Sequence, residues 1–213
     1  ARELVAAHID FGVLTTSLEA LKLTVVTPLA FEHSLSQRAS QSITTIVLPE
    51  GDDDRILQAA DQVLKNKIAN LIILGDPAAI TKRAAELGLD LSAAKLTSVT
   101  GSEHFEACVA EYLRLRAHKG VTPELARERM TDVSYFGSML VQLGIADGMV
   151  SGAKHTTAHT IKPSFEFIKT KPGVTSVSSV FLMALQDRVV VYGDCAVIPE
   201  PTEEQLADIA ISS

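Results

Sequence analysis

Two polar segments of the sequence hold residue types that could bind an anion. The first runs from Leu48 to Arg55 and contains one glycine, three consecutive aspartates and an arginine. Aspartates suit the start of a helix, where they accept backbone N–H groups and favour the positive end of the helix dipole. Arg55 in the first helical turn opposes that dipole, so an anionic ligand would explain it. A surface ion pair of Arg55 with Asp52 or Asp53 is the alternative, and spacing leaves both open.

The second segment runs from Ser151 to Pro163 and begins where a strand is expected to end. It contains one glycine, three threonines, two histidines and two lysines. Hydroxyls and backbone N–H groups beside a glycine, with cations close by, are ordinary ingredients of a phosphate or acyl-phosphate cradle. A solvated, well-capped loop is the alternative. The candidate substrate- or phosphate-binding residues of the two segments are Arg55, Ser151, His155, Thr156, Thr157 and Lys162.

Arg116 is a third candidate for anion binding. It follows Tyr112 by four residues on a helix expected after Ser102, at the edge of the buried face. Its side chain could extend past apolar neighbours to water, or project beyond the strand ends to meet an anion.

The sequence lacks the motifs of several other kinds of functional site. His155 and His159 stand four apart, as zinc ligands on a helix can, but the glutamate of His-Glu-x-x-His and a third ligand are missing, so we expect no metal. The sequence has no nucleotide-binding glycine loop and no Gly-x-Ser-x-Gly elbow. Cys108 and Cys195 show no Cys-x-x-Cys spacing, which favours reduced thiols.

Composition narrows the class of protein. The chain has 213 residues, 46% of them hydrophobic and 21% charged, with 5% aromatic residues and no Trp. A core of Ala, Val, Ile and Leu suits buried parallel strands covered by helices. The net charge of −7 without a basic stripe argues against nucleic-acid binding. No apolar run reaches the ~18 residues of a membrane span, and the first residues of the sequence do not read as a leader of a basic stretch followed by an apolar one.

Apolar runs separated by helical patterns predict an α/β fold. Strands are expected at residues 43–48, 71–74, 96–99, 148–151, 177–185 and 189–192, with helices between most of them. This alternation predicts a three-layer α/β/α core with a mainly parallel sheet. Ligands of such sheets bind at the carboxyl ends of the strands, so we expect Arg55, Ser151, Thr156 and Lys162 to lie near one another.

Both ends of the sequence suggest a piece of a longer protein. Residues 1–42 are weakly patterned, with a short helix expected from Pro28 and either a polar linker or a frayed helix end over residues 34–42. The chain starts without Met and stops at Ser213, inside a helix that Thr202 and Gln205 would begin as a capping box. We therefore expect residues 1–42 to form the tail of a preceding segment and residues 43–213 to form an incomplete domain.

Long stretches of the sequence resemble the phosphate acetyl/butyryl transferase family. The resemblance is carried by residues 46–57, 146–153, 155–158 and 168–170, and continues through 180–182 and 191–196. It covers about residues 43–213, and residues 1–42 resemble the end of the regulatory segment in the longer bacterial form of the family. The resemblance implies an isocitrate/isopropylmalate-dehydrogenase-like fold, here truncated, with the active site between two subdomains.

The same resemblance implies reversible acetyl transfer between acetyl phosphate and coenzyme A by a cytoplasmic homodimer. Coenzyme A, acetyl phosphate and phosphate would be its small-molecule substrates, with no cofactor, no nucleic acid and no membrane involved. A base would help to form the coenzyme A thiolate, which attacks the acetyl carbonyl, while arginines hold the phosphate. Phosphate butyryltransferase, and a non-catalytic acetyl-coenzyme-A-sensing domain of the same fold, are the alternatives.

The family's site residues carry over only in part. Arg55 matches an active-site arginine of the family, and Arg116 matches the arginine before its His-Lys-Gly turn. Lys162 stands where the family usually has arginine, and His159 where it usually has Asp or Asn. Lysine keeps the charge but loses the paired geometry of the guanidinium group. The family's catalytic aspartate and its serine–arginine pair are expected beyond Ser213. No catalytic residue is therefore assigned, and the chain alone is expected to be inactive.

Overall fold

The computed structural model describes residues 10–20, 26–174 and 176–213. The chain divides into two compact units, one of residues 34–177 and one of residues 1–33 with 178–213. After α3 (Pro28–Gln41), the first of these units contains β1 (Thr45–Leu48), α4 (Asp54–Lys65), β2 (Asn70–Leu74), α5 (Pro77–Leu87), β3 (Lys95–Thr97), α6 (Phe105–Arg116), the 3₁₀ turn η1 (Ala117–Lys119), α7 (Pro123–Met130), α8 (Val133–Gln142), β4 (Gly148–Met149), α9 (Thr157–Pro163) and the π-helical turn η2 (Ser164–Ile168).

A four-stranded parallel sheet organises the unit of residues 34–177. Its strand order is β3-β2-β1-β4. Thr45 of β1 is in register with Asn70 of β2, and Ile46 of β1 is in register with Gly148 of β4. Since all four strands are parallel, their carboxyl ends share one edge of the sheet. The predicted mainly parallel α/β fold is confirmed.

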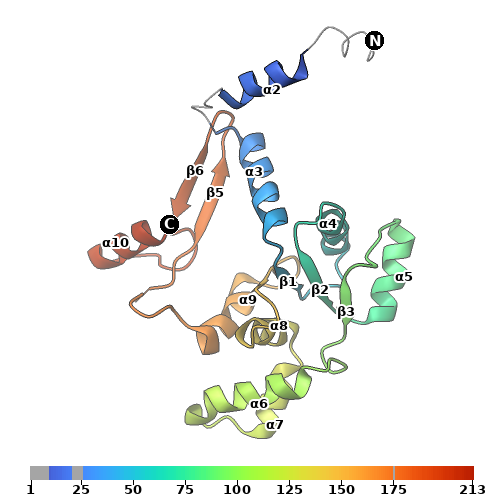
Figure 1. Ribbon diagram of the computed structural model, residues 1–213. Coiled ribbons are helices and arrows are strands. Elements are labelled where there is room, and N and C mark those ends of the chain that lie inside the picture. Colours follow the sequence, from blue (N-terminus) through green and yellow to red (C-terminus); the bar gives the residue numbers. More distant parts are fainter. Residues whose placement is uncertain (1–9, 21–25, 175) are drawn as a thin grey trace. The chain divides into compact units, whose positions relative to one another are not determined.

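Alternate residues of the central strands enter two separate hydrophobic cores. Val47 and Leu74 pack on one face with residues of α6, α7 and α8, such as Phe136. Leu48 and Ile73 pack on the other face with residues of α4 and α5. Side chains of a strand point alternately to its two faces, so helices on both sides are required to bury them. Figure 1 shows α4 and α5 beside the sheet and α6, α7 and α8 on its other side.

Side-chain caps place the helix starts at the carboxyl edge of the sheet. Asp53 caps α4 and accepts the backbone N–H of Arg55, and Asp76 caps α5 and accepts that of Ala78. Asp132 caps α8 in the same way. Each carboxylate satisfies N–H groups that have no partner within the helix.

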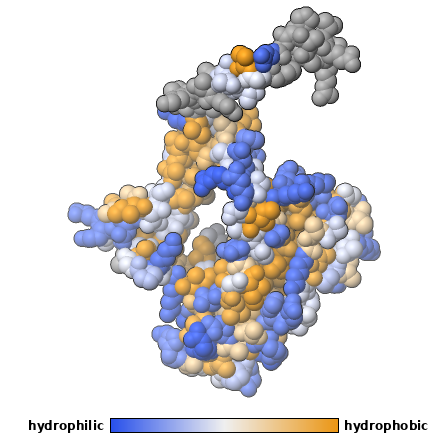
Figure 2. Space-filling model, in the orientation of Figure 1, coloured by the Kyte–Doolittle hydropathy of each residue, from blue (hydrophilic) through white to orange (hydrophobic). Residues whose placement is uncertain are grey.

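The second unit contains α2 (Phe11–Ala20), β5 (Val180–Ala184), β6 (Val189–Gly193) and α10 (Glu203–Ser212). The mainly parallel sheet does not include β5 and β6. They pair antiparallel in a sheet of their own, because residues 185–188 form a tight turn in which Leu185 N donates to Arg188 O at 2.8 Å. Figure 2 shows hydrophobic surface along this hairpin, to which Phe181 and Leu182 contribute with exposed fractions of 57% and 52%.

Two further expectations about the chain's elements are settled. The capping box of Thr202 and Gln205 at the start of α10 is confirmed. Of the two alternatives for residues 34–42, a linker or a frayed helix end, the structure shows helix, because α3 continues to Gln41. Its polar residues are mostly exposed on that helix. No helix among the described residues is long and apolar enough to span a membrane.

Candidate phosphate-binding loops

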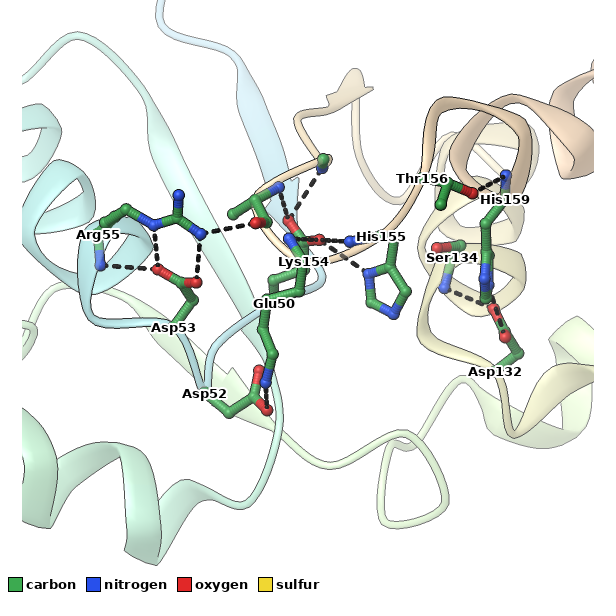
Figure 3. A network of polar contacts seen from close by, with 12 residues as sticks. Glu50, Asp52, Asp53, Arg55, Asp132, Ser134, Lys154, His155, Thr156 and His159 are labelled. Carbon is green, nitrogen blue, oxygen red and sulfur yellow. Dashed lines mark hydrogen bonds and ion pairs between the residues drawn. The ribbon is translucent and has the colours of Figure 1, made fainter.

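The two polar segments meet at the carboxyl edge of the sheet. One loop follows β1 and the other follows β4, and these strands are neighbours. Nη2 of Arg55 donates to the carbonyl oxygen of Ala153 at 2.6 Å (Figure 3). The expected convergence of the two segments is therefore confirmed for Arg55 and the loop after β4.

Glu50 lies at the centre of both loops, and sequence reasoning did not select it. Its buried Oε2 accepts the backbone N–H groups of Gly152 at 2.9 Å and Ala153 at 2.8 Å. Its Oε1 accepts those of Lys154 at 2.8 Å and His155 at 2.9 Å. The N–H groups that we expected to cradle a phosphate thus bind the protein's own carboxylate. That part of the prediction is wrong, because a buried carboxylate needs these donors.

The charge of Glu50 is stabilised by this arrangement. Burial alone would raise the pKa of the carboxyl group. Hydrogen bonds from the backbone of Lys154, His155 and Ala153, and from the His155 ring, outweigh burial and lower the pKa to about 2. Glu50 is therefore ionised at neutral pH, and the loop after β4 is closed around a permanent negative charge.

Arg55 is paired within its own loop. Oδ1 of Asp53 accepts Nε of Arg55 at 3.0 Å, and Oδ2 accepts Nη2 at 2.7 Å. This is the surface pairing that spacing had left open. The side chain of Arg55 is nevertheless 70% exposed. Its Nη1 has no hydrogen bond to any residue that the structure describes, so it remains available to an anion.

The two histidines of the second segment are each held by a carboxylate. Nδ1 of His155 lies 2.8 Å from Oε1 of Glu50, and Nε2 of His159 lies 2.8 Å from Oδ2 of Asp132. The ring centroids are 4.7 Å apart. Within the described ranges, no group of three or more His, Cys, Asp or Glu residues is placed to hold a metal ion.

The second segment is a loop only as far as Thr156. We expected a loop to Pro163, but Thr156 caps helix α9 by accepting the backbone N–H of His159 at 3.3 Å. Thr157 and Lys162 therefore lie on the helix, and both are exposed. No described residue outside α9 forms a hydrogen bond or ion pair with Lys162. The structure does not bring Lys162 into contact with Arg55.

Ser151 and Arg116 have different surroundings. The hydroxyl oxygen of Ser151 is buried and has no hydrogen-bond partner among the described residues. Arg116, at the end of α6, donates from Nη1 to the carbonyl oxygen of Glu166 at 3.2 Å, and its Nε is 3.9 Å from the Glu166 carboxylate. Arg116 thus contacts η2 rather than either of the two loops.

A pocket of about 380 Å³ opens at the carboxyl ends of β1 and β2. It borders the loop after β4, and Asp52 on its wall forms an ion pair with Nζ of Lys154. The residues that line it are Pro49, Asp52, Leu74, Gly75, Asp76, Val133, Lys154 and His155.

Comparison with known proteins identifies relatives that match most of this chain. Phosphate acetyltransferase of Nitratidesulfovibrio vulgaris is 52% identical over 206 residues, which cover 97% of this chain and 29% of the relative. The enzyme of Corynebacterium glutamicum is 54% identical over 183 residues, covering 86% of this chain and 56% of that protein. The chain therefore spans about a third to a half of the length of these curated relatives.

Solved structures agree with the sequence relatives. EutD phosphotransacetylase from Staphylococcus aureus superposes with a TM-score of 0.79 at 41% identity, covering 85% of this chain and 55% of that chain. A phosphotransacetylase from Streptococcus pyogenes gives a TM-score of 0.82 at 35% identity, with coverages of 87% and 56%. The family model described as phosphate acetyl/butaryl transferase matches residues 30–213. This chain belongs to the phosphate acetyl/butaryl transferase family.

Proposed function

We propose that the protein containing these residues is a phosphate acetyltransferase, which transfers acetyl reversibly between acetyl phosphate and coenzyme A. The observation that carries this proposal is the 52% and 54% identity to two phosphate acetyltransferases. The named relatives do not favour butyryl transfer or a non-catalytic acetyl-coenzyme-A-sensing domain.

The proposed reaction is a displacement at the acetyl carbonyl. A base takes the thiol proton of coenzyme A, sulfur forms a bond to the carbonyl carbon, and the bond from that carbon to the phosphate oxygen breaks. Negative charge collects on the departing phosphate, so fixed cations beside it lower the barrier. We assign the base and the family's serine–arginine pair to residues beyond Ser213. The 213 residues alone would then lack activity.

In this proposal the described residues supply part of the phosphate side of the site. Arg55 would offer Nη1, because Asp53 and Ala153 already hold the rest of its guanidinium group. Thr157 and Lys162 would offer an exposed hydroxyl and ammonium from α9. Ser151, Thr156 and Arg116 would lie at the edge of this phosphate-binding group of residues. The hydrogen bond to the carbonyl oxygen of Glu166 already orients the side chain of Arg116.

Three further properties belong to the proposal. We propose that the complete protein is a homodimer, acts in the cytoplasm and needs no cofactor. We also propose that residues 1–42 end a regulatory segment and that residues 43–213 begin the catalytic domain.

Substitution of Lys162 in the complete protein tests the phosphate side of the site. Lys162→Ala would remove a charge-assisted contact worth about 1.5–3 kcal/mol, which raises the KM for acetyl phosphate about ten- to a hundredfold. Lys162→Arg would retain activity, since the guanidinium group can hold two oxygens. Lys82→Ala on α5, another exposed lysine, is the control.

Two outcomes contradict these assignments. Unchanged constants for Lys162→Ala, equal to those of the Lys82→Ala control, would remove Lys162 from the site. A purified complete protein that forms no acetyl-coenzyme A from acetyl phosphate and coenzyme A would refute the proposed function itself.

A further inference from the structure

Glu50 does more than fill space between two loops. Its side chain is fully buried, and its two oxygens accept four consecutive backbone N–H groups, from Gly152 to His155. Gly152 adopts a φ of +115°, which favours glycine and lets the chain curl around the carboxylate. Without this charge, four donors would be left in a part-buried position with nothing to accept them.

Glu50 also sets the hydrogen-bonding state of His155. A carboxylate can only accept, so Nδ1 of His155 carries the hydrogen in the 2.8 Å contact with Oε1. Nε2 of a neutral ring is then a hydrogen-bond acceptor. Figure 3 shows this second nitrogen on the side of the ring turned away from Glu50. His155 lines the pocket at the ends of β1 and β2, and 27% of its side chain is exposed.

The charges around this pocket disfavour an anion. Asp52 and Lys154 pair with each other and cancel. Asp76, which caps α5, adds one further negative charge to the wall. Nε2 of His155 is an acceptor in a pocket with a negatively charged wall. An uncharged hydrogen-bond donor therefore suits this nitrogen better than an anionic phosphoryl group does.

We infer that Glu50 is a positioning residue, which fixes the Gly152–His155 loop and presents Nε2 of His155 as an acceptor to an uncharged donor of the substrate. This inference rests on the proposed function. Of the proposed substrates, coenzyme A carries such uncharged donors in its amide N–H groups and its thiol. The acetyl phosphate dianion offers only acceptors, and the O–H donor of inorganic phosphate belongs to an anion. His155 therefore serves coenzyme A rather than phosphate, which differs from its assignment by sequence.

Substitutions at His155 separate the two roles of its ring. His155→Asn places an amide nitrogen near the position of Nδ1, so it can still donate to Glu50, but it has no atom at Nε2. His155→Gln can reach the position of Nε2 but loses the donor to Glu50. In the complete protein, we expect His155→Asn to keep slow amide exchange in residues 150–160 and to raise the KM for coenzyme A about five- to tenfold. The KM for acetyl phosphate should stay within twofold.

Glu50→Gln tests the positioning role. The glutamine side chain would turn its N–H₂ group toward backbone N–H groups that need an acceptor, so the loop would be held less firmly. Hydrogen exchange of the backbone amides of residues 150–160 should therefore accelerate, kcat should fall and the KM for coenzyme A should rise. Asp61→Asn is the matched control, because Asp61 is also a buried carboxylate. It accepts hydrogen bonds from the backbone N–H of Asp90 at 3.0 Å and from Nζ of Lys65 at 2.7 Å. That control should destabilise the protein without changing either KM.

Each outcome decides the inference. An unchanged coenzyme A constant in His155→Asn would overturn the role of Nε2, and unchanged amide exchange in Glu50→Gln would overturn the positioning role. Equal kinetic losses in Glu50→Gln and Asp61→Asn would reduce Glu50 to a general contribution to stability. A wild-type protein without acetyl transfer would refute the proposed function and this use of His155 together, and amide exchange would then still decide whether Glu50 fixes the loop.

Discussion

Tyr135 should contribute strongly to stability through a single hydroxyl group. Its hydroxyl donates to Oε1 of Glu166 at 2.8 Å, and the hydroxyl of Tyr112 donates to Oε2 of the same carboxylate at 2.9 Å. The two tyrosines are 3% and 2% exposed. The carboxylate of η2 is thus bound from α6 and α8, and we expect Tyr135→Phe to weaken the attachment of η2 to these helices.

The magnitude follows from what the substitution removes. Phe keeps the ring, which packs at 6.4 Å between centroids against Phe167, so no large cavity forms. The loss is one hydrogen bond to a charged acceptor, worth about 1.5–3 kcal/mol. With a urea dependence of about 1–3 kcal/mol per molar, the midpoint of unfolding should fall by about 1 M.

Urea unfolding followed by circular dichroism measures this shift. Tyr192→Phe is the control, since Tyr192 is 57% exposed and should change stability by less than about 0.5 kcal/mol. The variant Tyr112→Phe/Tyr135→Phe should depart from the sum of the single changes, because both hydroxyls share one acceptor. A midpoint for Tyr135→Phe equal to that of the control would refute the reasoning.

Two further predictions concern the loop after β1. The pKa of Glu50 is lowered from 4.5 to about 2, so its ionised form stabilises the fold above pH 4.5, and this contribution, on the order of 3 kcal/mol, is lost as the pH falls toward 2. Acid unfolding of Glu50→Gln should therefore be flatter than that of the wild type over this range, and parallel curves would contradict the shift. A Cβ at Gly51 would lie 2.5 Å from the carbonyl oxygen of Leu74, so Gly51→Ala should destabilise by about 1–3 kcal/mol. A thermal midpoint of Gly51→Ala equal to that of the wild type would show that the backbone accommodates the Cβ without loss of stability, and would contradict this prediction.

Local chemistry made most of the elements predictable. The capping box of Thr202 and Gln205 was expected from sequence and is confirmed, since a cap needs only residues within one turn. The buried strands were predictable because they are short apolar runs. The antiparallel hairpin of β5 and β6 carried a usable signal that was not followed, namely a connection too short for a parallel crossover.

The role of Glu50 was not predictable from spacing. Its partners begin at Gly152, 102 residues away, and their contact depends on β4 lying next to β1 in the sheet. The polar composition of the second segment indicated correctly that its backbone binds an anion. It could not indicate that the anion belongs to the protein.

The site therefore consists of polar groups that largely satisfy one another. Glu50 holds the second loop and Asp53 holds Arg55, while Asp132 holds His159. Side chains fixed in this way need little reorganisation when a ligand arrives, which is how preorganised sites stabilise developing charge. Within the described part of the loops, the ring nitrogen of His155 turned from Glu50 and Nη1 of Arg55 stay uncommitted, in addition to the buried hydroxyl of Ser151. The ring nitrogen is an acceptor and Nη1 belongs to a cation, so under the proposed function they would bind different substrates, and kinetics can test them separately.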